Sequence, residues 1–150
     1  NDITEIGYKY QLTDIGASLL IESINEFNKI KKHRNKIYDI YSKNIEYNKK
    51  INYLKNNDPK SNCVMWLFTI LTPHKDLLQK KLRQFRIESN QVHFRNDRYS
   101  IFKKYIKNKK FPNMQKLQNQ YLVLPMHTKM SFSDALNVSK TINFIIKKIK

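Results

Sequence analysis

Cysteine and glycine are nearly absent from this chain of 150 residues. It has one cysteine, Cys63, and two glycines, Gly7 and Gly16. A single cysteine cannot build an internal disulfide framework, and its place at the entrance of an apolar run predicts a small, inert, buried side chain. Two isolated glycines exclude a glycine-rich phosphate loop. The sequence therefore predicts neither a disulfide scaffold nor a nucleotide-binding loop of that type.

Metal-ligand spacings and long apolar runs are also missing. The chain has four histidines: His33, His74, His93 and His127. None stands at a metal-ligand spacing with another histidine, a cysteine or a carboxylate. No apolar run approaches the roughly 20 residues that span a bilayer. We therefore expect no metal, no membrane segment and, given the cysteine usage, a cytoplasmic protein.

Acidic residues are scarce, with 12 aspartates and glutamates against 29 lysines and arginines, which gives a formal net charge of +17. A surface this positive attracts polyanions, so a basic nucleic-acid-binding domain is one alternative. The cations are mostly lysines spread over the whole chain, and they accompany many asparagines and isoleucines. A solvated lysine-rich surface is the favoured explanation of that composition, and no helix-turn-helix, zinc-finger or RNP pattern is present.

The apolar pattern near the start of the chain predicts a long amphipathic helix. Apolar residues recur at helical spacing from Leu12 to Ile45. Thr13 is suited to cap the helix start, and Asp14 suits the positive end of the helix dipole. A helix over residues 13–48 would be about 50 Å long at 1.5 Å per residue. Because a domain of this size does not need such a length, we expect it to bend or to lie across a partner.

The rest of the sequence alternates short strands and helices after a loop at residues 53–62. Apolar and turn patterns predict strands over 64–71, 87–94 and 121–125, and a helix from Thr72-Pro73 to about Arg86. Ser131 and Asp134 form a capping box that opens a last helix. We predict one α+β domain over residues 1–150, with a small, mainly antiparallel sheet covered by helices and a long N-terminal helix.

Two stretches stand out as candidate sites. In a strand over 87–94, His93 and Arg95 would share one face, while Val92 and Phe94 would face the core. An imidazole beside a guanidinium suits a phosphate or diphosphate, and Arg98 extends the pair. The alternative is that His93 hydrogen-bonds within the fold and Arg95 pairs with Asp97.

The second stretch is residues 7–15, GYKYQLTDI, in which a loop presents a lysine and two tyrosines just before the long helix. This stretch resembles the opening of the carboxy-terminal domain of the DegT/DnrJ/StrS family of nucleotide-sugar aminotransferases. The same resemblance continues in order through WLFTI at 66–70, RIE at 86–88, VHF at 92–94 and LVLP at 122–125. It covers essentially the whole chain.

The resemblance implies a pyridoxal-phosphate enzyme of fold-type I that converts a keto sugar nucleotide to an amino sugar and works as a homodimer. It implies that the loop with Lys9 and Tyr10 reaches into the neighbouring subunit, where Lys9 contacts the cofactor phosphate. His93, Arg95 and Arg98 would then face the nucleotide-sugar substrate. Residues 95–99, RNDRY, replace the family's usual proline-containing continuation, which leaves the bound sugar and nucleotide open.

The resemblance also implies that part of the active site is absent from this chain. In that family the lysine that links covalently to the cofactor lies in a large amino-terminal aminotransferase domain, and no lysine here has the serine- and glycine-rich setting of that residue. We therefore expect the chain to be the carboxy-terminal part of a longer enzyme and to be inactive by itself. A stand-alone, non-catalytic remnant of the fold that serves for binding or assembly remains the second hypothesis, ahead of nucleic-acid binding.

Overall fold

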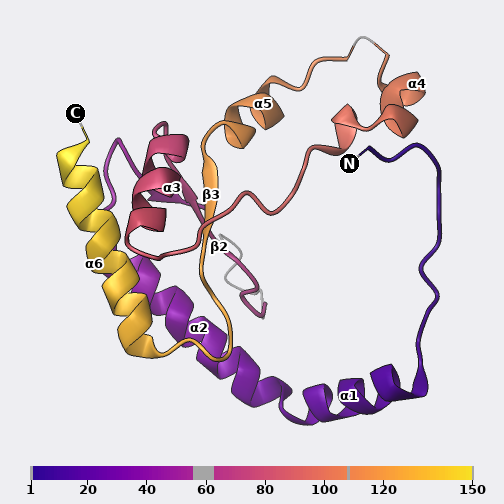
Figure 1. The fold of residues 1–150 in the computed structure, drawn as a ribbon, viewed down its shortest axis with the longest axis horizontal. Coiled ribbons are helices and arrows are strands. Elements are labelled where there is room, and N and C mark those ends of the chain that lie inside the picture. The colour runs from indigo at the N-terminus through magenta and orange to yellow at the C-terminus, as the bar shows by residue number, and fades with distance from the viewer. Residues whose placement is uncertain (1, 56–62, 108, 150) are drawn as a thin grey trace.

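A computed structural model describes residues 2–55, 63–107 and 109–149. Its sheet has three strands in the order β1-β2-β3, with β1 at Asn52–Tyr53, β2 at Phe68–Leu71 and β3 at Tyr121–Leu124. Both pairings are antiparallel. Helices α2 (Phe27–Asn44), α3 (Lys75–Gln84) and α6 (Phe132–Lys148) pack beside the sheet (Figure 1). The predicted α+β class, a small antiparallel sheet covered by helices, is confirmed.

The hydrophobic core lies where these three helices meet the sheet. From α2 it contains Ile37 and Tyr41, and from the sheet Phe68 and Leu122, all at most 1% exposed. Helix α6 adds one apolar stripe, which consists of Ala135, Val138, Ile142, Ile145 and Ile146. The capping box that opens α6 is present, because the Ser131 hydroxyl accepts from the Asp134 amide at 3.1 Å. A local sequence signal therefore placed this helix correctly.

The long helix predicted over residues 13–48 is two helices. Helix α1 (Asp14–Asn25) and α2 are separated at Glu26, and α2 ends at Asn44. Thr13 caps α1 as predicted, with its hydroxyl accepting from the Gly16 amide at 3.1 Å. The expected bend therefore occurs at Glu26. It allows α2 to pack on the core while α1 extends beyond the body of the fold (Figure 1).

Of the predicted strands, one is shorter than expected and another is not formed. Strand β2 covers only 68–71 of the predicted 64–71, because β3 is four residues long and Phe68 already pairs with its last residue, Leu124. The predicted strand over 87–94 is wrong, since only Asn90 forms a bridge, to Val123. Beyond it, both backbone groups of His93 bond the Tyr121 hydroxyl, at 3.0 and 2.6 Å. A side chain thus takes the place of the strand partner.

Other boundaries also moved. Helix α3 begins at Lys75, because Thr72 uses its hydroxyl to accept from the His74 amide at 3.1 Å. After α3, Arg86 adopts the left-handed conformation with φ 59°, which glycine adopts at lower cost. Strand β1 lies at the start of the predicted loop over 53–62, and most of that loop lies outside the described residues. Cys63, expected to be buried, is exposed.

The connection between residues 95 and 120 forms a separate helical extension of the body. It contains the 3-10 turns η1 (Asn96–Arg98) and η2 (Ser100–Phe102) and the short helices α4 (Lys103–Ile106) and α5 (Pro112–Gln118). Figure 1 shows this extension projecting from the sheet toward the start of the chain. None of the helices in the described parts of the chain is both long and apolar enough to cross a bilayer.

Candidate functional site

The candidate residues fall into two places, an exposed arm and a segment beside α5. The arm is residues 4–12, which run from the helical extension to the start of α1 (Figure 1). Lys9 is exposed, and among the described residues it has no hydrogen-bond or ion-pair partner. Tyr8 and Tyr10 are 79% and 85% exposed, and their rings stack on each other with centroids 5.5 Å apart. The arm therefore presents an available ammonium group, and the two tyrosines next to it in sequence stack on each other.

The second place is the 93–98 segment, of which residues 93–97 line a cavity of about 520 Å³ together with α5 and Tyr121. His93 is exposed at the cavity rim, and its ring and that of Trp66 form a T-shaped contact with centroids 5.8 Å apart. Most of the cavity wall is apolar, with Phe94, Phe111 and Met114 among its residues. The cavity thus combines an imidazole with a largely aromatic and aliphatic lining.

Arg95 is buried, at 8% exposed, and its guanidinium is used within the fold. Its Nε donates to Asp97 Oδ1 at 2.8 Å, and its Nη1 donates to Gln115 Oε1 at 2.6 Å. The bond from Arg95 holds the pKa of Asp97 below its usual value. Arg98 donates to the same Gln115 oxygen at 3.1 Å. The alternative in which Arg95 pairs with Asp97 is therefore the arrangement observed.

These contacts show that the three predicted substrate residues are not equally available to a ligand. His93 and Arg98 are exposed, whereas Arg95 ties the 93–98 segment to α5. Sequence reasoning missed Gln115 and Tyr121, which hold this segment in place. Pro112 at the first position of α5 was a usable signal for that helix, because proline is favoured there. The contact between Gln115 and Arg95, 20 residues away, had no local signal.

Arg95→Lys is expected to loosen the 93–98 segment, because an ammonium cannot make the paired bonds that the guanidinium makes to Asp97 and Gln115. Amide hydrogen exchange at Arg98 and Tyr99, which close η1, should rise by about tenfold. The pKa of Asp97 should move up toward its usual value. On acidification, the pair's contribution to stability would therefore be lost at a higher pH than in the unmodified chain. Arg98→Lys is the control. Equal exchange in both variants would contradict the anchoring role of Arg95.

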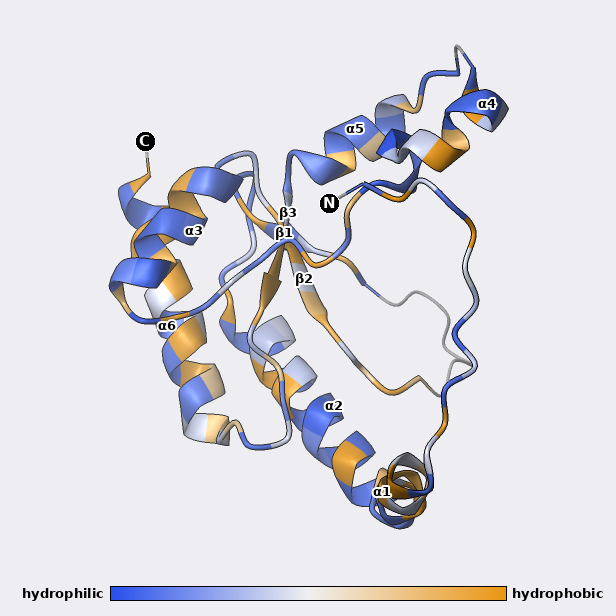
Figure 2. Cartoon of the chain, turned by 45° about the vertical axis from the view of Figure 1, so that its right-hand side comes forward, coloured by the Kyte–Doolittle hydropathy of each residue, from blue (hydrophilic) through white to orange (hydrophobic). Residues whose placement is uncertain are grey.

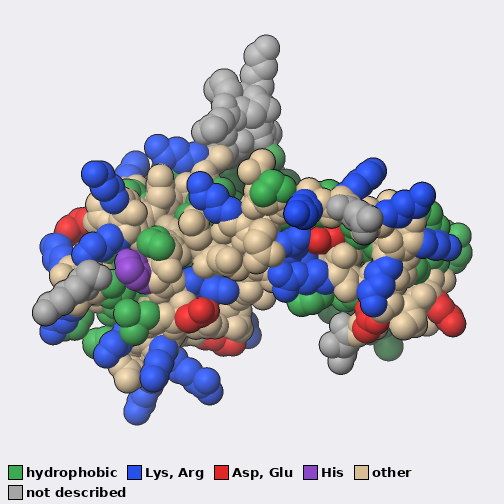
Figure 3. Space-filling model, turned by 90° about the horizontal axis from the view of Figure 1, so that it is seen from above, with side chains coloured by type: hydrophobic (Ala, Val, Ile, Leu, Met, Phe, Trp, Pro, Cys, Tyr) green, Lys and Arg blue, Asp and Glu red, His purple; other side chains and the backbone are tan. Residues whose placement is uncertain are grey.

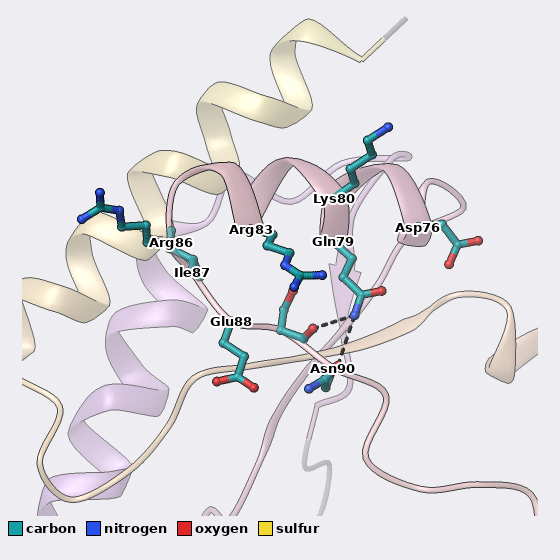
Figure 4. Close-up of a pocket in the computed structure, with 9 residues that line it drawn as sticks. Asp76, Gln79, Lys80, Arg83, Arg86, Ile87, Glu88 and Asn90 are labelled. Carbon is teal, nitrogen blue, oxygen red and sulfur yellow. Dashed lines mark hydrogen bonds between the residues drawn. The ribbon is translucent and has the colours of Figure 1, made fainter.

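A further cavity of about 660 Å³ lies between α3 and residues 86–90. Gln79 crosses it and donates to the Ser89 carbonyl at 2.7 Å and to Asn90 Oδ1 at 3.2 Å. In Figure 4, Arg83 points toward the 88–90 segment, while Lys80 and Arg86 point away from it. None of the predicted site residues lines this cavity, so we place the candidate site at the arm and the 93–98 segment.

Lysine and arginine side chains are scattered over the face shown in Figure 3, with acidic side chains among them. The described residues contain no group of three or more histidines, cysteines or carboxylates placed to hold a metal ion. The site's chemistry, as far as these residues provide it, is therefore that of cations, an imidazole and aromatic rings. Cationic side chains of this kind are suited to binding phosphate groups.

The comparisons with known proteins agree on one protein family. The model of the DegT/DnrJ/EryC1/StrS aminotransferase family matches residues 1–143. A UDP-4-amino-4,6-dideoxy-N-acetyl-beta-L-altrosamine transaminase of Campylobacter jejuni is 26% identical over 154 aligned residues, which cover 100% of this chain and 41% of that protein. The same enzyme from a second C. jejuni strain is 25% identical over the same shares. The chain thus spans about 41% of the length of these curated relatives.

Solved structures share the fold. DesV of S. venezuelae superposes with a TM-score of 0.84 at 17% identity, over 93% of this chain and 38% of that one. PseC of Helicobacter pylori, an aminotransferase of pseudaminic acid biosynthesis, superposes with a TM-score of 0.77 at 16% identity, over 99% of this chain and 41% of that one. At these identities the likeness establishes the fold of the chain.

Proposed function

The chain belongs to the DegT/DnrJ/EryC1/StrS aminotransferase family, and from this membership we propose that it forms the carboxy-terminal domain of a pyridoxal-phosphate aminotransferase. Its substrate would be a keto sugar nucleotide, which the enzyme converts to an amino sugar. The transaminases of C. jejuni that align with the whole chain support this substrate class. The proposal places the enzyme in the cytoplasm, where disulfides are rare, and this chain has one cysteine.

The observation that carries the domain proposal is the apolar surface of α1. None of its residues is buried, and five aliphatic side chains are 51–76% exposed: Ile15, Leu19, Leu20, Ile21 and Ile24. Figure 2 shows hydrophobic colouring along α1, which lies apart from the body. Apolar patches of this kind mark interaction surfaces. Because the chain matches only 41% of its relatives' length, we propose that the aminotransferase portion of the same enzyme covers α1.

The arm fits a contact with the cofactor phosphate. Lys9 offers an exposed ammonium without a partner among the described residues, and a compact cation is a good phosphate ligand. When bound, pyridoxal phosphate supplies the electron sink for amino-group transfer. In this proposal Lys9 binds its phosphate in the neighbouring subunit of a homodimer and Tyr10 lies beside it. His93 and Arg98 face the sugar nucleotide, and Arg95 orients their segment.

The chain by itself is expected to bind no pyridoxal phosphate as a lysine-linked chromophore. A titration of the purified chain with the cofactor should give no absorbance band at about 420 nm, where the lysine-linked cofactor absorbs. The complete enzyme that contains this chain should give that band. A complete polypeptide that gives no band would instead support the non-catalytic remnant. Tight, salt-sensitive binding of the chain to random duplex DNA would support the nucleic-acid alternative.

A further inference from the structure

We propose that Asp2 and Ser100 form a latch that fixes the start of the arm to the helical extension and so positions Lys9. Asp2 Oδ1 accepts from the Ser100 amide at 2.9 Å, and Asp2 Oδ2 accepts from the Ser100 hydroxyl. Next to them, the Ile101 amide donates to the Ile3 carbonyl at 3.1 Å. Three hydrogen bonds therefore join two segments that are 98 residues apart in sequence.

The latch provides a hydrogen-bond acceptor for the backbone at the start of η2. This 3-10 turn starts at Ser100, and Tyr99, the residue at its cap position, provides no side-chain cap. The first amides of a helical turn have no partner inside the turn. Asp2 therefore acts as a capping carboxylate supplied by another segment. The Ser100 bonds, together with the charge of Lys103, lower the pKa of Asp2, so the carboxylate is ionised at neutral pH.

The latch also connects the two halves of the candidate site. Ser100 follows Arg98 by two residues, and the 93–98 segment is itself tied to α5 through Gln115. At its other end, the arm joins α1, where Thr13 caps the helix. Between these two ends, the side chains of the arm are exposed. Lys9 is thus carried on a loop held at both ends, one of them at η2, which begins two residues after the 93–98 segment.

Holding both ends restricts the volume that Lys9 samples. If the latch opens, the arm is fixed only at α1, and ordering it again costs conformational entropy for each residue fixed. A latched arm presents the ammonium already oriented, and preorganisation of this kind strengthens binding without any new contact. The functional consequence, a preorganised phosphate contact by Lys9, rests on the function proposed above. The latch itself does not depend on that function.

Nuclear magnetic resonance of the full 150-residue chain tests the latch directly. In Asp2→Ala and Ser100→Ala, amide exchange at Ile101 should rise by about tenfold, and the backbone order parameter of Lys9 should fall below about 0.6. Ser100→Thr keeps the hydroxyl and should restore both values. Asp76→Ala removes an exposed carboxylate from α3 and is the control, with no expected change.

Acidification is a second readout, and comparison with Asp2→Ala separates the latch from Asp97 and Asp134, whose pKa values are also lowered. Because the hydrogen bonds from Ser100 hold the pKa of Asp2 below its usual value, the latch should persist at neutral pH and open as the pH falls through the folded pKa. The change in Lys9 order should be absent in Asp2→Ala. If Lys9 is as mobile in the unmodified chain as in Asp2→Ala, the latch is overturned. None of these measurements requires the cofactor, so they leave the proposed function to its own test.

Discussion

Phe68→Ala is expected to lower the free energy of unfolding of the chain by about 3–5 kcal/mol, the usual range for removing a fully buried aromatic ring. Phe68 is 0% exposed at the start of β2. Its ring contacts those of Tyr38 and Tyr41, both with centroids 5.0 Å away, and of Tyr53 at 5.4 Å. Alanine would lose the apolar burial and leave a cavity among three large rings. Since domains are stable by about 5–15 kcal/mol, the loss would be a large fraction of the stability.

Urea unfolding followed by tyrosine fluorescence and circular dichroism measures this change. Phe94→Ala is the matched control, because it removes the same ring at a position that is 51% exposed. We expect its midpoint to move much less, with the slope of free energy against urea concentration unchanged. Equal losses in the two variants would show that the Tyr38, Tyr41 and Tyr53 rings do not form the centre of the core.

The sequence predicted those elements whose signals are local. The capping box at Ser131 and the apolar run at 121–124 each specify structure within a few residues, and both were correct. Helical periodicity also identified α1 and α2, but periodicity reveals only which residues share a face. It does not reveal what covers that face, and for α1 no described residue of this chain buries it. The break at Glu26 followed no proline or glycine and so had no local signal.

The candidate site was harder to predict, because its geometry depends on contacts distant in sequence. His93 and Arg95 were expected to share one face of a strand, and that required a strand partner over their whole length. The Tyr121 hydroxyl, 28 residues away, bonds both backbone groups of His93 instead. Once the strand is absent, strict alternation no longer applies. Phe94, expected in the core, is exposed, and Arg95, expected at a surface, is buried against Asp97.

Lys9→Ala in the complete enzyme is expected to weaken pyridoxal-phosphate binding by about 10- to 100-fold, the effect of losing a charge-assisted hydrogen bond to a phosphate, about 1.5–3 kcal/mol. The change removes one exposed side chain, so the stability of the fold should not change. Titration of the apoenzyme with the cofactor, followed by absorbance, measures the affinity. Lys140→Ala, which removes an exposed lysine from α6, is the control, and an equal loss there would indicate only a general effect of positive charge.

The Lys9→Ala variant also tests whether the arm enters the active site of its own subunit or that of the neighbouring subunit. Consider mixed dimers of Lys9→Ala subunits with subunits that lack the lysine that links to the cofactor; each homodimer alone is impaired at both of its sites. If Lys9 reaches into its neighbour, each mixed dimer has one site with both lysines, and activity should rise toward half that of the unmodified dimer per mixed dimer. If Lys9 acts within its own subunit, every site in the mixed dimer lacks one of the two lysines and activity stays low. Recovery on mixing would therefore require that the arm contacts the cofactor of the partner subunit, because no other arrangement places the two lysines in one site.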